Sequence, residues 1–199
     1  EGGKAVFVKA DVSRKNEVDD LIKTAVKEFG TVDVLVNNAA ILDAQPVLEI
    51  TEDLWDRQMA VNCKGTIFCS QAAAAEMKKN KGGKIINISS IGALAAQPGL
   101  CAYHSTKAAT LAITRSFALE LMEWNIQVNA VVPGTTSTGM AERAMKDPNF
   151  KRLVVDPIPM GRLGDPKELL GAVLYFATAD SNYCTGQTLV VDGGVLAII

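Results

Sequence analysis

The segment Gln127-Val-Asn-Ala-Val-Val-Pro-Gly134 is the most informative about the class of fold, because proline and glycine close an apolar run there. Val32–Asn37, Lys84–Ile88 and Thr188–Val191 share its apolar character without strict alternation of polar and apolar residues. Strands with both faces buried show this pattern, because helices cover the sheet on either side. With a further short strand expected over Ala5–Lys9, the sequence predicts a parallel sheet.

Helix-forming segments alternate with these strands, which is typical of a sheet covered on both faces. Ser13 is the candidate N-cap of the first helix, and Gly30 ends it. Asp165, followed by proline, is a typical helix start. We therefore predict a doubly wound, Rossmann-like α/β fold with three layers, as one domain over residues 1–199. The expected helices span residues 18–29, a region from Thr51 through the seventies with a break near Asn62, Tyr103–Trp124 and Leu169–Ala177.

Composition and charge argue against several classes of function. The chain of 199 residues has a formal net charge of −2, so we expect no basic surface for nucleic acid or anionic lipid. Its apolar runs are far shorter than the ~20 residues of a membrane-spanning helix. A single histidine and the lack of any Cys-x-x-Cys pair argue against a metal site. Its four cysteines, expected as free thiols, favour a cytoplasmic protein.

The segment Tyr103-His-Ser-Thr-Lys107 contains a pair of groups suited to proton transfer. Residues four apart lie on one face of a helix, so Tyr103 and Lys107 are expected to point the same way. A tyrosine pKa of about 10 is too high for a general base at neutral pH, and a nearby ammonium lowers it. The pair could therefore exchange a proton with a carbonyl or a hydroxyl. An exposed lysine beside a half-buried tyrosine would show the same spacing.

Polar side chains follow two of the predicted strands. Ser89 and Ser90 come directly after Lys84–Ile88, and Asn37-Asn38 end an earlier strand. Ligands of parallel α/β sheets bind at the carboxyl ends of the strands. A hydroxyl there can donate to a substrate oxygen as charge develops, although serine also ends strands through turn chemistry alone.

Four motifs occur in one chain: Asn37-Asn-Ala-Ala40, Tyr-x-x-x-Lys at 103–107, Gln127–Gly134 and Thr185-Gly-Gln-Thr-Leu-Val-Val-Asp-Gly-Gly194. Their order and spacing resemble the short-chain dehydrogenase/reductase family, in its single-domain branch with the shorter chains. The resemblance covers essentially all 199 residues. It implies an oxidoreductase that transfers a hydride between NAD or NADP and a secondary alcohol or ketone.

The resemblance assigns the chemistry to four residues. Tyr103 matches the catalytic acid/base, and Lys107 matches the residue that lowers the tyrosine pKa and bonds the nicotinamide ribose. Ser90 matches the serine that holds the substrate oxygen, with Ser89 as the less favoured choice. Asn62 matches the asparagine whose main chain holds a water linking Lys107 to solvent, and a helix irregularity there would free a carbonyl.

The same resemblance places the cofactor along several segments. Asp11 matches a residue that contacts the adenine ring, and Asn37 and Ala39 match the strand end beside the adenosine. The stretch Pro-Gly-x-x-x-Thr matches the segment around the nicotinamide. The implied cofactor-binding residues are Asp11, Val12, Asn38, Ala39, Ala40, Tyr103, Lys107, Pro133, Gly134, Thr136 and Thr138.

Three features depart from the family pattern. Ala40 stands where glycine is usual, which is a mild change of one methyl group. His104 would face about 100° away from Tyr103, so we interpret it as a surface or packing residue. No glycine-rich turn for the pyrophosphate is present. We therefore expect about 40–50 further residues, roughly one βαβ unit, before Glu1. They belong to a longer protein, which we favour, or were lost in a natural truncation that binds cofactor poorly.

The expected substrate wall runs over residues 91–97 and from Thr138 to about Met160. Its small apolar residues suit a 3-oxoacyl group, a sugar acid or a small ketone.

A homotetramer or homodimer is expected, through the apolar tail Val195–Ile199 and the helix that begins at Tyr103. The residues that select NAD or NADP normally lie at the end of the second strand, upstream of Glu1. A mobile lid over the substrate is expected from Met140, Ala141, Met145 and Phe150.

A non-catalytic member of the same fold, which senses nucleotide or acts as a scaffold, is the alternative function. Such a protein is expected to lack one of the four chemical residues, and all four are present. A longer-chain epimerase would need more residues than follow Tyr103, and a divergent enoyl reductase would space its tyrosine and lysine more widely. We therefore favour the enzyme.

Overall fold

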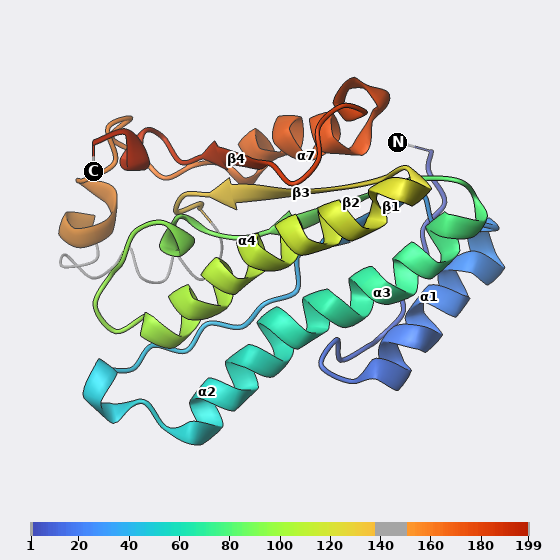
Figure 1. Cartoon of the computed structure of the whole chain (residues 1–199). Helices are drawn as coiled ribbons and strands as arrows, with labels where there is room; N and C mark the ends of the chain where they lie inside the picture. The colour runs from blue at the N-terminus through green and yellow to red at the C-terminus, as the bar shows by residue number, and fades with distance from the viewer. Residues whose placement is uncertain (1, 138–150, 199) are drawn as a thin grey trace.

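The computed structural model describes residues 2–137 and 151–198, in which four parallel strands form one sheet (Figure 1). The strands lie in the order in which they occur in the sequence. They are β1 (Val34–Asn37), β2 (Gly83–Ile88), β3 (Ile126–Pro133) and β4 (Thr188–Val191). The predicted parallel sheet is confirmed, and each of these four strands begins and ends within two residues of its predicted bounds.

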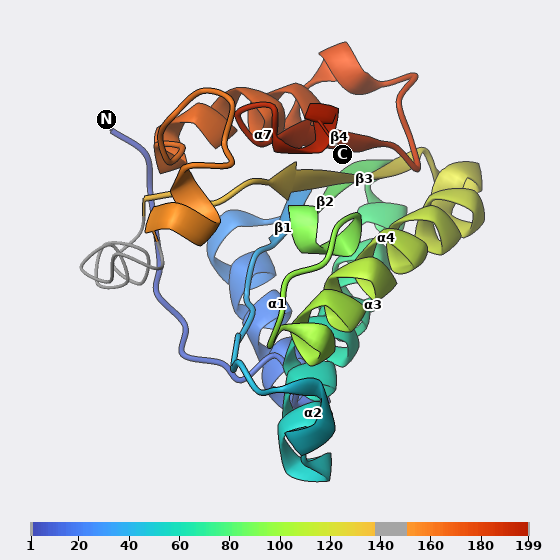
Figure 2. The same ribbon diagram turned by 90° about the vertical axis from the view of Figure 1, so that its left-hand side faces the viewer.

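Helices cover both faces of the sheet, as Figures 1 and 2 show. On one side lie α1, α3 and α4, and α7 lies on the other. This arrangement confirms the predicted three-layer α/β architecture. The helices are α1 (Lys15–Phe29), α2 (Glu52–Met59), α3 (Gly65–Lys79), α4 (Cys101–Leu121) and α7 (Leu170–Ala177).

Short helical turns connect these elements. The described 3₁₀ turns are Val47–Glu49, Ile91–Ala93, Met122–Trp124, Pro166–Leu169, Ala179–Ser181 and Val195–Ile198. Ala60–Lys64 and Lys151–Val155 are π-helical turns. Asp165 caps the turn before α7 in a capping box, which confirms the predicted helix start.

The core explains why the strands lack a polar and apolar alternation. Ile85 and Val128 pack with α1, α3 and α4, whereas Ile86 and Val131 pack against α7. All four side chains are fully buried. A strand covered on both faces must be apolar at successive positions, which accounts for the runs seen in the sequence.

Two local predictions at the start of the chain are wrong. Residues 5–9 form no strand, because no second strand lies beside them among the described residues to pair with their backbone (Figure 2). Phe7 is largely exposed. Ser13 does not cap α1. Its hydroxyl donates to the Asp11 carboxylate instead, and Arg14 occupies the N-cap position without a side-chain hydrogen bond.

The predicted break near Asn62 is confirmed as the π-helical turn Ala60–Lys64, which joins α2 to α3. Gly65 follows this turn, and a Cβ added there would lie 2.7 Å from Val12 Cγ2. The close approach of Val12 thus favours glycine at the start of α3.

Within the described residues, none of the helices has the length and apolar character that crossing a membrane requires.

Candidate active site

The carboxyl ends of β1, β2 and β3 lie side by side, because the strands are parallel and paired in register. Asn37 pairs with Asn87, and Ile88 pairs with Val131. The residues that follow each strand therefore gather at one edge of the sheet, where the first turns of α4 also lie. This edge contains the catalytic residues expected from the sequence.

Tyr103 and Lys107 lie one turn apart near the start of α4 and face the end of β2. The Lys107 Nζ donates to the Ile88 carbonyl at 2.9 Å and lies 5.6 Å from the centre of the Tyr103 ring. The Ser90 hydroxyl, which follows β2, lies close enough to the Tyr103 phenol to favour its ionised form. The structure thus brings Ser90, Tyr103 and Lys107 together.

The acidity of Tyr103 differs from the sequence-based expectation. Burial of the phenol raises its pKa above the ordinary value, and the nearby Ser90 hydroxyl only partly offsets this effect. The lowered pKa expected from the sequence is therefore not found in this structure, where burial is the larger effect and Lys107 is not among the groups that shift the phenol. Tyr103 is therefore a neutral phenol at pH 7, which suits a proton donor.

Lys107 is itself strongly affected by its surroundings. Burial disfavours the ammonium and lowers the pKa of Lys107 from 10.5 to about 8, with a smaller opposing effect from Cys63. Its three N–H donors make one hydrogen bond to the described residues, to Ile88. Lys107 thus remains able to donate to a ligand hydroxyl.

The two consecutive serines after β2 have different roles in the structure. The Ser89 hydroxyl is buried and donates to the Lys107 carbonyl at 2.8 Å. The Ser90 hydroxyl contacts Tyr103 and accepts a hydrogen bond from the Gly92 amide at 3.1 Å. Of the two, Ser90 is therefore the hydroxyl beside the candidate acid.

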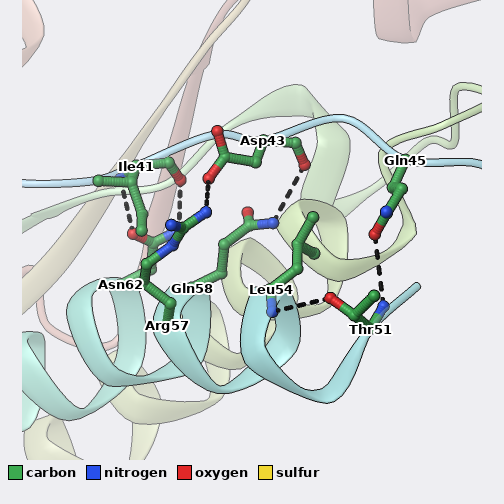
Figure 3. Close-up of polar contacts among 8 residues, drawn as sticks. All are labelled: Ile41, Asp43, Gln45, Thr51, Leu54, Arg57, Gln58 and Asn62. Atoms are coloured by element: carbon green, nitrogen blue, oxygen red, sulfur yellow. Dashed lines mark hydrogen bonds and ion pairs between the residues drawn. The ribbon is translucent and has the colours of Figure 1, made fainter.

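Asn62 lies in the π-helical turn and binds the segment after β1 with its side chain (Figure 3). Its Oδ1 accepts from the Ile41 amide and its Nδ2 donates to the Ile41 carbonyl, both at 2.9 Å. The Asn62 carbonyl accepts from the Thr66 hydroxyl at 2.8 Å. The water-holding role implied for this carbonyl stays a prediction.

Further contacts fasten the same segment to α2 (Figure 3). The Arg57 guanidinium and the Asp43 carboxylate form an ion pair at 2.6 Å, and Gln58 Nε2 donates to the Asp43 carbonyl at 3.1 Å. The Thr51 amide donates to Gln45 Oε1 at 3.3 Å. Residues 41–45 are therefore held along α2 at several points.

The implied cofactor residues are divided among several places. Hydrogen bonds from Ser13 lower the pKa of the Asp11 carboxyl, and the charge of Lys64 adds a smaller effect in the same direction. Asn38, Ala39 and Ala40 are exposed after β1, whereas the Asn37 amide is directed inward, to Ser70 and Asn87. Pro133 ends β3 beside Val191, Gly134 packs on Asp192, and Thr136 bridges to Gly164.

The nicotinamide-ribose half of a dinucleotide fits this edge of the sheet. Lys107 offers spare donors for ribose hydroxyls, and the exposed backbone of Asn38–Ala40 offers carbonyl and amide groups nearby in the fold. Gly134 permits the close approach of the backbone after β3 to Asp192, since a Cβ there would lie 2.7 Å from Asp192 Cα. The donor set thus suits the cofactor class implied by the sequence.

Two hollows border this region. One of about 420 Å³ lies between the residues after β3 and the end of β4, and its wall includes Gly134, Thr136, Ile158 and Met160. The other lies beside the start of α4, between Pro46-Val47 and Gln97–Gly99. Thr138 and the predicted lid residues Met140, Ala141, Met145 and Phe150 fall outside the described residues.

Sequence reasoning missed Thr106, which lies between Tyr103 and Lys107. Its buried hydroxyl accepts from Asn62 Nδ2 at 3.0 Å and donates to the Tyr103 carbonyl at 2.7 Å. It also missed Asn87, which links Asn37 to Thr114 of α4. The available signal was a polar residue inside an apolar helix or strand, which requires a partner when buried.

His104 is half-buried and packs on the turn after Ser90, where a Cβ added to Gly92 would collide with the imidazole. This position agrees with its interpretation as a packing residue.

The described part of the chain contains no cluster of side chains that could hold a metal ion.

Comparison with known proteins gives one consistent result. Residues 1–196 match a family model described as enoyl-(acyl carrier protein) reductase. The chain is 40% identical to an uncharacterized oxidoreductase of Thermotoga maritima, over 99% of this chain and 79% of that protein. It is 38% identical to a 3-oxoacyl-[acyl-carrier-protein] reductase of Synechocystis, over 98% of this chain and 77% of that protein.

A solved structure shares the fold closely. A gluconate 5-dehydrogenase from Burkholderia cenocepacia, in complex with NADP and tartrate, superposes with a TM-score of 0.91 at 34% identity. The match covers 95% of this chain and 74% of that chain. The sequence motifs, the three-layer fold and these relatives agree, and the chain belongs to the short-chain dehydrogenase/reductase family of oxidoreductases.

Proposed function

We propose that this protein interconverts a ketone and a secondary alcohol with Tyr103 as its acid/base. Membership in the family makes the chain an NAD(P)-dependent oxidoreductase that acts on CH–OH groups. The observation that carries the residue assignment is the position of the Tyr103 phenol, which lies near the Ser90 hydroxyl and beside the Lys107 ammonium. This trio can hold a carbonyl oxygen and give it a proton.

Each residue of the site has a separate task in this proposal. The cofactor supplies or accepts the hydride when it is bound. Ser90 donates a hydrogen bond to the substrate oxygen, and Tyr103 gives that oxygen a proton in reduction or removes it in oxidation. Lys107 bonds the nicotinamide ribose, while Asn62 holds the water that reconnects Lys107 to solvent.

The cofactor is NAD or NADP, and the proposed contacts are the eleven residues that the sequence implies, from Asp11 to Thr138. Support comes from the B. cenocepacia gluconate 5-dehydrogenase, which contains NADP. Asn38–Ala40, Pro133 and Gly134 lie at the carboxyl ends of strands, where ligands of such sheets bind.

The proposed substrates carry a carbonyl on an acyl chain, a sugar acid or a small apolar ketone. The relatives include a 3-oxoacyl reductase and a gluconate dehydrogenase. The expected wall over residues 91–97, beside Ser90, is largely small and apolar, which suits an apolar group next to the carbonyl. The four-residue spacing of Tyr103 and Lys107 favours ketone reduction over the enoyl reduction named in the family model.

We also propose that the protein works in the cytoplasm as a homodimer or homotetramer, each subunit forming one domain. Its four cysteines are free, which suits a reducing compartment. Exposed apolar side chains on α4 and at the C-terminal end supply candidate contact surfaces.

A fluorescence titration with NADH and NADPH, followed by a panel of carbonyl substrates, tests the proposal. The titration uses the protein in its natural form. We expect micromolar binding of at least one cofactor and turnover of at least one class among 3-oxoacyl thioesters, keto sugar acids and cyclic ketones. No cofactor binding would instead support the non-catalytic alternative.

A further inference from the structure

We propose that Thr106 is a positioning residue that joins the segment after β1 to the helix that carries Tyr103 and Lys107. The value of this link to catalysis rests on the proposed function, whereas the link itself rests on the hydrogen bonds of Thr106. The Thr106 side chain is fully buried between α4 and the π-helical turn. Its hydroxyl connects two elements that are 44 residues apart in the sequence at their point of contact.

The direction of each hydrogen bond follows from the chemistry of a hydroxyl. Thr106 has a single O–H proton, which it donates to the Tyr103 carbonyl at 2.7 Å. Towards Asn62 the same oxygen can then act only as an acceptor, so the amide must present Nδ2, at 3.0 Å. Thr106 thus fixes which way round the Asn62 amide lies.

The orientation of Asn62 in turn fixes the backbone at Ile41. Nδ2 has two protons and gives one each to Thr106 and to the Ile41 carbonyl, while Oδ1 accepts from the Ile41 amide. A reversed amide would place like groups opposite each other at both Ile41 contacts. The buried Asn62 amide is therefore satisfied only with Thr106 in place.

A second contact strengthens the same joint. The Cys63 thiol, next to Asn62, contacts the Thr106 carbonyl at 3.5 Å. Asn62 thus contacts the Thr106 hydroxyl, and Cys63, the next residue of the π-helical turn, contacts the Thr106 carbonyl. The turn and the first part of α4 are expected to move together.

The joint has a functional consequence because of what lies on either side of it. Ile41 directly follows Asn38–Ala40, the proposed cofactor segment, and Thr106 is flanked in α4 by Tyr103 and Lys107. The link therefore sets the distance between the wall of the nucleotide site and the acid/base. Loosening it should weaken cofactor binding more than it slows the chemical step.

Thr110 provides a matched control, one turn further along α4. It is almost as buried as Thr106, and its hydroxyl donates to the Thr106 carbonyl at 3.0 Å within the helix. Among the described contacts it makes no side-chain hydrogen bond to another element. Thr110→Val thus removes a buried threonine hydroxyl without cutting the link.

The test compares Thr106→Val, Thr106→Ser and Thr110→Val in the full-length protein, by hydrogen exchange of the Ile41 amide and by cofactor KM and kcat. We expect Thr106→Val to speed Ile41 exchange at least tenfold and to raise cofactor KM about tenfold, with kcat reduced less than threefold. Thr106→Ser should stay within about twofold of wild type in each quantity. Thr110→Val should leave Ile41 exchange and KM unchanged.

The inference is overturned if Thr106→Val keeps wild-type Ile41 exchange, or if Thr110→Val has the same effects as Thr106→Val. If Thr106→Val does not fold, Thr106→Ala removes the same hydroxyl with less crowding, and the same criteria apply to it. Failure of the wild-type protein to turn over would count against the proposed function alone, because the exchange of Ile41 decides the link without catalysis.

Discussion

Tyr103 and Lys107 show what residue spacing can and cannot predict. Their separation by one helical turn could be read from the sequence, and the structure places both side chains at the end of β2. The direction of the tyrosine pKa shift could not be read from the sequence, because it depends mainly on how far the folded protein buries the phenol. Sequence spacing identifies side chains that are neighbours along a helix. The pKa of such a side chain also depends on the residues of other elements that bury it.

Lys107 should make stability depend on pH in a defined window. Its pKa is about 8 in the folded protein against 10.5 ordinarily, so the unfolded chain binds more protons between these values and stability rises with pH there. Urea unfolding should find Lys107→Met more stable than wild type at pH 7, by at most about 3 kcal/mol. This advantage should shrink as the pH approaches 10.5, and an unchanged difference at pH 7 and pH 10 would contradict the assignment.

Gly92 should be required because of His104. A Cβ at this position meets the imidazole and should displace the turn that holds Ser90, lowering kcat/KM at least tenfold in Gly92→Ala. Adding His104→Ala should recover most of the loss, because the smaller side chain makes room. A double variant as impaired as Gly92→Ala would show that the collision is not the cause.

At the level of elements, the long helix from Glu52 to Lys79 was predictable with its interruption. The π-helical turn lies where the sequence suggested, and it positions Asn62 over Ile41. The contacts of residues 41–45 with α2 were not predictable, because they join side chains and backbone groups with no sequence periodicity. The strand expected over residues 5–9 failed for a similar reason, since a strand exists only with a pairing neighbour.

Gln58 offers a test of the contact between α2 and residues 41–45. Its Oε1 is buried without a hydrogen-bond partner in the described structure, and its Nε2 bonds only the half-buried Asp43 carbonyl. Gln58→Leu removes the unsatisfied oxygen, so the free energy of unfolding should stay level or rise by up to ~1 kcal/mol. Thr51→Ala, which removes the N-cap of the same helix, should instead cost about 1 kcal/mol. A loss of more than about 2 kcal/mol in Gln58→Leu by urea unfolding would refute this.

At the level of the whole molecule, the fold class followed from the four apolar strands and the helices between them. The parallel pairing of the strands and the presence of helices on both faces of the sheet agree with that prediction. Of the expected substrate wall, residues 91–97 follow Ser90, and residues 138–150 fall outside the described residues. The assembly of subunits stays a proposal, since apolar sequence at the C-terminal end shows a candidate surface and not its partner.

Light scattering coupled to size exclusion tests that assembly. Leu119 and Met122 at the end of α4, and Ile198 near the C-terminal end, are more than half exposed. We expect a dimer or tetramer at micromolar concentration, and a shift towards monomer in Leu119→Asp and Ile198→Asp, because burying a charge at an interface is costly. A wild-type protein that elutes as a clean monomer would remove the proposal.

The most direct measurement of the central claim is the turnover of Tyr103→Phe beside wild type, with cofactor affinity and unfolding followed in both. The Tyr103 hydroxyl is the only group removed, so we predict that turnover falls at least a thousandfold while stability changes little. Cofactor binding should persist, because the other ten proposed contacts remain. Retained turnover in a folded Tyr103→Phe, with any substrate of the panel, would contradict the assignment of this phenol as the acid/base.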